Sequence, residues 1–223
     1  MSTRIGVLAE GPIDHALIAP IIRQIATKRA QFTWPVDPAD AAEWLKLRPR
    51  GHGGVWLAVQ KAIRVLQEEE FPYSFIIILL DRRTKAIQGK IRRLISGRDR
   101  FVLAVAQEEI EAWWLGDRPC TLSWLRFDAA PGNTRYAKPG YQAERDKEPK
   151  KTLTELTQES PNPEIDRNYG EGNLDLARDF ADFWEGRVNL PEIEGQCPKR
   201  FRPFCHDTTE AFRRAKTSEG RLL

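Results

Sequence analysis

Three short apolar runs predict buried β-strands. They span residues 5–9, 75–80 and 101–106. Each run is continuously apolar rather than alternating, which is typical of strands in a parallel sheet that is covered on both faces. A fourth strand is expected over residues 32–36. We expect it at an edge of the sheet, because Pro35 has no backbone N–H to donate to a neighbouring strand.

Helical periodicity lies between these runs. Apolar residues recur every three or four positions over residues 17–25, 55–66 and 84–95, and again over 174–184. Asp14 is a candidate N-cap for the first helix, and Pro20 is expected to kink or restart it. The alternation of strand and helix predicts right-handed crossovers. The expected fold is therefore α/β and Rossmann-like, with a small, mostly parallel sheet and helices on both faces.

The character of the chain changes after Asp117. The following stretch is polar and rich in turn-forming Pro, Gly and Asn residues, before the helical pattern at 174–184. A chain of 223 residues can bury one good core but hardly two. We expect a single domain, with residues 1–117 as the α/β core and residues 118–223 as a polar, helix-containing elaboration packed on it.

Composition points to a protein of the cytoplasm. The chain is 41% hydrophobic and 30% charged, and its longest apolar runs fall far short of the ~20 residues that span a bilayer. The first residues are too few and too polar for a signal peptide. Three irregularly spaced cysteines fit reduced thiols better than disulfides. We therefore expect a cytoplasmic protein with no membrane association.

Positive charge is concentrated in one stretch, although the net charge is only +3. Residues 82–100 contain eight basic side chains and a single acid, Asp99. Such a face could bind a polyanion, or it could be an ordinary solvated helix surface. The sequence leaves both readings open.

Acidic residues directly follow the three apolar runs. Glu10 follows the first, Asp81 the second, and Glu108, Glu109 and Glu111 the third. Parallel strands end at one edge of the sheet, where open α/β folds bind their ligands. Clustered carboxylates suit Mg²⁺ or Mn²⁺. The alternative is that each acid only caps the helix that follows it.

The third group leaves the choice of glutamate open. If the strand continues, Glu109 and Glu111 share a face; if a helix begins by Gln107, Glu108 and Glu111 do. Glu111 is favoured in both cases. Lys150 lies in the polar stretch and is a candidate to neutralise a phosphate near the site.

Together these residues resemble the Toprim-type fold. The likeness rests on Glu10-Gly11-Pro12-x-Asp14, on Asp81 and on the sequence from Glu109 to Trp113. More closely, the chain resembles an uncharacterised bacterial family related to the nuclease domains of OLD proteins, often encoded beside ATPases in phage-defence loci. Further segments support this likeness and extend it over most of the chain: residues 48–53, residues 148–150, Tyr169 and residues 197–204.

The resemblance implies a metal-dependent nuclease that works with a nearby ATPase in antiphage defence. Its catalytic residues would be Glu10, Asp81 and Glu111, and Asp14 and Glu109 would join them as ligands of Mg²⁺ or Mn²⁺. The implied substrate is nucleic acid, with DNA favoured over RNA, and the residues expected to hold it are Lys85, Arg92, Arg93 and Lys150.

One position departs from the Toprim pattern. Toprim sites carry Asp-x-Asp at the second strand, whereas this chain has Asp81-Arg82-Arg83. A fixed positive charge in place of an acid argues for one metal ion or none. The alternative function is a catalytically inactive binding or regulatory subunit, in which Arg83 pairs with Glu10 or Asp81. The sequence does not indicate an oligomeric state.

Overall fold

The computed structural model of the chain describes residues 2–47, 51–66, 71–81, 85–106, 108–165, 169 and 172–219. This described part contains one sheet of four parallel strands: β1 (Thr3–Leu8), β2 (Val36–Asp40), β3 (Phe75–Asp81) and β4 (Phe101–Ala106). The strand order is β2-β1-β3-β4. The predicted α/β class with a parallel sheet is confirmed.

Ten α-helices accompany the sheet within the described residues. They are α1 (Pro12–Lys28), α2 (Ala41–Trp44), α3 (Gly51–Val65), α4 (Lys85–Ile95), α5 (Glu111–Gly116), α6 (Arg118–Trp124), α7 (Pro149–Gln158), α8 (Leu174–Trp184), α9 (Leu190–Gln196) and α10 (Phe201–Glu219). Two 3₁₀ turns, η2 (Arg135–Ala137) and η3 (Ala143–Arg145), lie between α6 and α7. Of the helices in this part of the chain, none is both long and apolar enough to cross a membrane.

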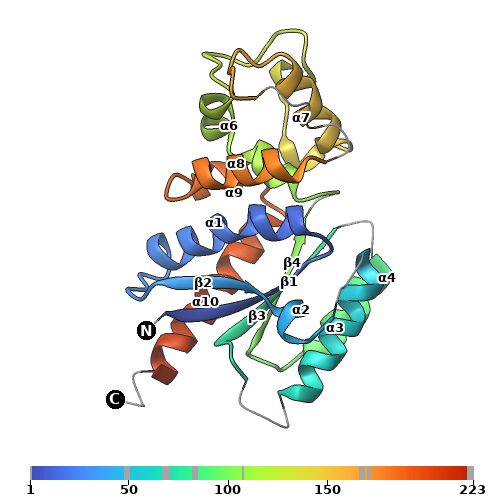
Figure 1. Ribbon diagram of the computed structural model, residues 1–223, viewed down its shortest axis with the longest axis vertical. Coiled ribbons are helices and arrows are strands. Elements are labelled where there is room, and N and C mark those ends of the chain that lie inside the picture. Colours follow the sequence, from blue (N-terminus) through green and yellow to red (C-terminus); the bar gives the residue numbers. More distant parts are fainter. Residues whose placement is uncertain are drawn as a thin grey trace.

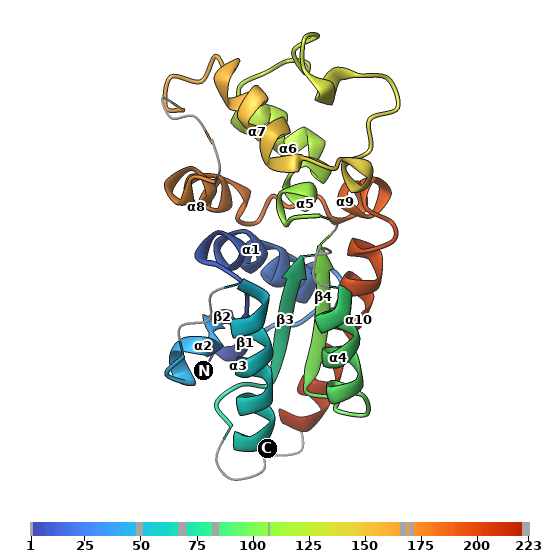
Figure 2. The ribbon, with the colours of Figure 1, turned by 90° about the vertical axis from the view of Figure 1, so that its right-hand side faces the viewer.

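Helices cover both faces of the sheet. In β3, Phe75, Ile77 and Leu79 face one hydrophobic cluster, whose helical members come from α1, from α10 and from the helices α5 to α9. Ile76, Ile78 and Leu80 face the other cluster, with residues of α2, α3 and α4. Figure 2 shows α10 and α4 flanking β4 on its two sides. Burial on both faces explains why the strand is apolar without alternation.

The edge strand β2 differs from the prediction. The fourth strand lies at an edge of the sheet, as expected. The predicted range 32–36 was wrong, because pairing with β1 begins only at Val36 and continues to Asp40. Phe32 instead packs into the core, where its ring lies 5.3 Å from that of Phe212. The sequence of β2, Val-Asp-Pro-Ala-Asp, gives no apolar signal. An edge strand needs only one partner, so it tolerates Pro38 in the ladder.

The first helix also differs in two details. Gly11 is its N-cap and Pro12 opens its first turn, so Asp14 is not the cap that the sequence suggested. The helix runs from Pro12 to Lys28 without a restart at Pro20, which is buried. Asp14 therefore lies inside the first turn, where its carboxylate accepts a hydrogen bond from the backbone of Gly11.

The polar segment after Asp117 stands beyond the carboxyl ends of β3 and β4. Figures 1 and 2 show α6 and α7 at the end of the molecule farthest from the N-terminus, with α5, α8 and α9 between them and the sheet. The chain then returns through α10, which packs against β3 and β4. Within the described part of residues 118–223, the stretch before α10 lies over one edge of the sheet, and we call it the cap. Helix α10 covers one face of the sheet.

Asp117 fastens this cap. Its side chain is fully buried and accepts hydrogen bonds from the indole of Trp184 (2.6 Å) and the backbone N–H groups of Asn189 (2.8 Å) and Cys120 (3.4 Å). These donors belong to the helices α8, α9 and α6 or to the residues that begin them. One buried carboxylate therefore joins three separate segments of the cap.

The sheet constrains Gly6 sterically. A Cβ atom at Gly6 would lie 2.9 Å from Ile76 Cγ1 and 3.1 Å from the side chains of Ala41 and Tyr73. We predict that Gly6→Ala destabilises the protein by about 1–3 kcal/mol through overpacking. The matched control is Gly89→Ala, where no atom lies within 4 Å of the added carbon and α4 gains about 0.5–1 kcal/mol. Urea unfolding of both variants measures this; equal effects would contradict the close packing around Gly6.

Candidate functional site

The strand order reverses between β1 and β3. The chain leaves β1 for β2 on one side, while β3 lies on the other side of β1. A crevice forms outside the carboxyl ends of strands at such a switch point, and open α/β sheets bind ligands there. Glu10 follows β1 and Asp81 ends β3, so both lie at this crevice. Glu10 Oε1 accepts a hydrogen bond from the backbone N–H of Asp81 (3.1 Å), which holds its side chain across the two strand ends.

The turn after β4 decides which glutamates face inward. Glu108 has a φ of 60°, a left-handed conformation that is uncommon for a residue other than glycine. The chain turns there, and α5 begins at Glu111. Glu109 and Glu111 are then 7% and 1% exposed. Of the alternatives left open by the sequence, the structure therefore brings the pair Glu109 and Glu111 to the site.

Two groups from the cap compensate these glutamates. Lys150, in the first turn of α7, places its ammonium nitrogen 3.5 Å from Glu109 Oε1 and 3.9 Å from Glu111 Oε1. The hydroxyl of Tyr169 donates a hydrogen bond to Glu111 Oε1 (2.7 Å). Burial by itself lowers the pKa of Lys150, but the charges of Glu111 and Glu109 more than offset this, so its pKa is raised. The lysine stays charged between its two partners.

The remaining acids lie in the same electrostatic field. Burial, and after it the negative charges of Asp14, Glu10, Glu111 and Glu109 in that order, together raise the pKa of Asp81 to about 8. Burial likewise raises the pKa of Asp14 to about 7, helped by the charges of Glu111 and Glu10. We call these five residues the carboxylate cluster. The charges of the other four acids that the sequence marked as metal ligands therefore all act on Asp81.

The donor set of the carboxylate cluster suits a hard divalent cation. Asp14 and Asp81 resist ionisation because burial and like charges oppose it, and a bound cation would relieve both effects. The geometry is less complete. Among the described residues, no group of three or more His, Cys, Asp or Glu side chains is arranged to hold a metal ion as it stands. Binding would require side chains to turn inward together, so the cluster fits Mg²⁺ or Mn²⁺ by chemistry but is not preorganised.

The predicted nucleic-acid contacts divide into three groups. Lys150 lies within the carboxylate cluster, where it already has anionic partners. Lys85, Arg92 and Arg93 are exposed on α4, a helix without an acidic residue. Lys85 begins α4, directly after the segment that follows β3, whereas Arg92 and Arg93 lie in its last turn. Arg82 and Arg83 lie outside the described residues, so the departure from Asp-x-Asp receives no structural account.

Two further residues shape the site without a sequence signal for their roles. Tyr169 is almost fully buried against Glu111, although it comes from a polar stretch with no periodicity. Gln88, on α4, donates a hydrogen bond from its side-chain amide to the backbone carbonyl of Asp81 (2.9 Å).

Comparison with known proteins adds no relative. No protein-family model matches the chain, and neither a curated protein nor a solved structure matches it significantly. The likeness to Toprim and OLD-type nuclease domains therefore stays a resemblance of residues and serves below only as a basis for proposals.

The raised pKa values predict an unusual dependence of stability on pH. Asp81 and Asp14 keep their protons in the folded protein up to pH values of about 8 and about 7, but both ionise near 3.8 when exposed. The unfolded state therefore binds fewer protons between these limits, so the free energy of unfolding should fall as pH rises from about 4 to 8. Urea unfolding in the presence of a chelator measures this fall.

Asp81→Asn should flatten that dependence, because the amide cannot ionise. Asp128→Asn is the matched control, since Asp128 is exposed and follows α6, away from the carboxylate cluster. Two results would contradict the raised pKa values of Asp81 and Asp14. One is a wild-type protein whose free energy of unfolding rises through the same pH range. The other is an Asp81→Asn variant whose free energy of unfolding depends on pH as steeply as that of the wild type.

Proposed function

We propose that the protein is a divergent Toprim-type nuclease that hydrolyses phosphodiester bonds with Mg²⁺ or Mn²⁺. The observation that carries the proposal is the carboxylate cluster at the switch point of the sheet. Structural acids rarely gather in this way, because five of them repel one another in a buried site. A divalent cation would offset the repulsion among these acids and could bridge them to the phosphate of a substrate.

The position of each acid in the carboxylate cluster suggests its role in the reaction. Glu10, Asp14, Asp81, Glu109 and Glu111 would hold the cation. When bound, Mg²⁺ or Mn²⁺ would neutralise charge on the phosphoryl oxygens. Glu10 is oriented by the backbone N–H of Asp81 and is the best placed to act as the general acid or base. Asp81 and Asp14 would release their protons as the cation binds, so affinity for the cation should increase with pH.

Positive charge near the site would guide the nucleic acid. The Lys150 side chain is about one-third exposed, at 36%, and can contact a phosphate while it pairs with Glu109 and Glu111. Lys85, Arg92 and Arg93 form an exposed basic face on α4 that would attract the backbone. As the resemblance implies, we propose DNA in preference to RNA as substrate, and an ATPase encoded nearby as partner in antiphage defence.

A second candidate is an inactive binding or regulatory subunit. The observation in its favour is the Lys150 ammonium, which already sits between Glu109 and Glu111 where a cation would otherwise compensate them. A tethered ammonium could replace the metal ion altogether, and the described carboxylates are not arranged as a ready metal site. In this reading the carboxylate cluster is a structural remnant.

Activity assays with two conservative variants test the nuclease directly. We expect the wild type to cleave DNA with Mg²⁺ or Mn²⁺, and Glu10→Gln and Glu111→Gln to lose at least about 100-fold in rate, as is typical when an acid or base is removed. Glu10→Gln keeps an oxygen that can accept from the N–H of Asp81, so the fold should be retained. Cleavage of labelled plasmid and RNA, with and without the neighbouring ATPase, provides the readout.

Glu164→Gln is the control, because that side chain is 79% exposed and pairs with Arg126 on the surface. A wild type without activity on any of these substrates, or active variants of Glu10 and Glu111, would refute the nuclease proposal.

Lys150→Met separates the two candidates. It leaves Glu109 and Glu111 without their cation, and we expect a loss of about 1–3 kcal/mol, less than for a fully buried pair because the lysine is partly exposed. If the protein binds a divalent ion, excess Mn²⁺ should restore most of this stability. If Lys150 has replaced the metal, Mn²⁺ should have no effect on either protein. Thermal melts with chelator and with Mn²⁺ distinguish these results.

A further inference from the structure

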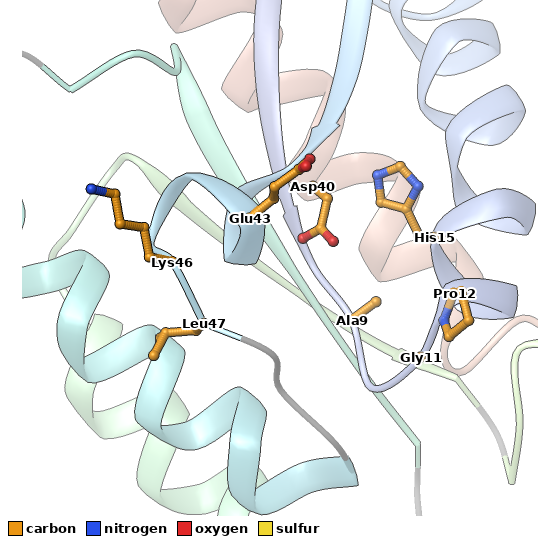
Figure 3. Close-up of a pocket in the computed structure, with 8 residues that line it drawn as sticks. All are labelled: Ala9, Gly11, Pro12, His15, Asp40, Glu43, Lys46 and Leu47. Carbon is orange, nitrogen blue, oxygen red and sulfur yellow. The ribbon is translucent and has the colours of Figure 1, made fainter.

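A cavity lies beside the carboxylate cluster. It has a volume of about 640 Å³ and opens at the carboxyl ends of β1 and β2. Its lining, drawn in Figure 3, consists of Ala9, Gly11, Pro12, His15, Asp40, Glu43, Lys46 and Leu47. Ala9 and Gly11 are the immediate neighbours of Glu10. The cavity, which we call the β2 pocket, is thus joined to the candidate site through a single loop.

The polar groups of the β2 pocket are mainly hydrogen-bond acceptors. Asp40 and Glu43 are both exposed, and Figure 3 shows their carboxylates on the same side of the pocket, across from His15. Asp40 Oδ1 accepts from the backbone N–H of Ala42 (2.8 Å) as the N-cap of α2, which fixes the position of the carboxylate. The pocket therefore presents oriented acceptors to any ligand that carries N–H or O–H groups.

His15 adds an unsatisfied group. Its Nε2 atom is enclosed and has no hydrogen-bond partner among the described residues. A buried nitrogen without a partner costs about 1–3 kcal/mol, so such an atom usually marks a place where a ligand or water completes the structure. His15 also lines the β2 pocket, so a ligand held there would lie beside its ring.

The pocket continues into a further cavity of about 520 Å³ on the side of α8. Both cavities are lined by Pro12, His15 and Asp40, and the second is also lined by Arg23 and Arg178. Lys46 lies at the first cavity and is exposed. The second cavity is also lined by the acids Asp182 and Glu185, and Glu185 forms an ion pair with Arg23 (2.7 Å). The two cavities therefore present side chains of both charges around His15 and Asp40.

We propose that the β2 pocket binds an amino-bearing nucleobase (cytosine, adenine or guanine) of a strand whose phosphate lies at the carboxylate cluster. This inference rests on the proposed nuclease function. Asp40 and Glu43 accept hydrogen bonds from exocyclic amino groups, as acidic side chains do from cytosine N4. Pro12 and Leu47 supply apolar surface for the ring, and Lys46 reaches a phosphate of the same strand.

Thymine and uracil fit the same geometry less well. Neither base carries an exocyclic amine, and each offers a single N3–H donor between two carbonyl oxygens that would face the carboxylates of Asp40 and Glu43. The same two carboxylates repel a phosphate placed beside them. The pocket should therefore make the protein selective for the base beside the cleaved bond, while the carboxylate cluster handles the phosphate without regard to sequence.

Free nucleosides test the pocket without any need for cleavage or metal. We would titrate the isotope-labelled full chain with deoxycytidine, deoxyadenosine, deoxyguanosine or thymidine, and follow backbone amide signals by NMR. We expect the amides of residues 9–15 and 40–47 to shift with the first three, which should bind about 5-fold to 100-fold more tightly than thymidine. Equal binding of all four, shifts confined to other regions, or no shifts at all would overturn the proposal.

Two variants then assign the selectivity. Asp40→Asn keeps an N-cap for α2, since asparagine caps as well as aspartate, and Glu43→Gln changes an exposed side chain. Each should reduce the preference over thymidine several-fold, whereas Asp128→Asn should leave it unchanged. An undiminished preference in both variants would also overturn the proposal. The α2 amide signals report whether the helix remains folded.

Cleavage assays separate this inference from the function on which it rests. Metal-dependent cleavage without base selectivity in the NMR titration would leave the nuclease standing and remove the β2 pocket as a base site. Selective nucleoside binding without cleavage by the wild type would leave the base site standing and favour the regulatory subunit over the nuclease.

Discussion

The repulsion among five acids at one edge of the sheet is the constraint around which this molecule is organised. Parallel strands deliver their following residues to the same edge, so Glu10, Asp81 and the glutamates after β4 cannot avoid one another. The protein limits the penalty in three ways. Asp81 and Asp14 hold protons, backbone and tyrosine donors serve individual oxygens, and the ammonium of Lys150 sits between two carboxylates.

The cap is therefore part of the site, because it supplies side chains that contact the carboxylate cluster. Lys150 begins α7, and Tyr169 follows that helix, so both compensating groups come from the segment beyond Asp117. Asp117 in turn fixes α8 and α9 against the core through Trp184 and Asn189. Loosening the cap would expose the carboxylate cluster to water. It would also move the Lys150 ammonium away from Glu109 and Glu111. Stability of the cap and chemistry of the site are coupled for that reason.

The sequence predicted those features that depend on local pattern. Three buried strands were readable because burial on both faces leaves a continuous apolar run, and the helix at 174–184 was readable because burial on one face leaves a helical apolar period. The edge strand β2 was placed too early in the sequence, because its residues are mostly not buried and leave no apolar run. The acids at strand ends were readable, but the choice of Glu109 with Glu111 depended on the left-handed turn at Glu108. Contacts of Tyr169 and the pocket around His15 arise only from tertiary packing, which no local pattern encodes.

The return of α10 to the sheet has a consequence for biosynthesis. This helix covers one face of β3 and β4, yet it is translated long after them, because the whole cap is encoded in between. At about 5–20 residues per second, the uncovered face waits on the order of ten seconds on the ribosome. Apolar side chains such as Phe75 and Val102 are without their final neighbours throughout that interval. The order of elements along the chain thus leaves an apolar face of the sheet uncovered during synthesis.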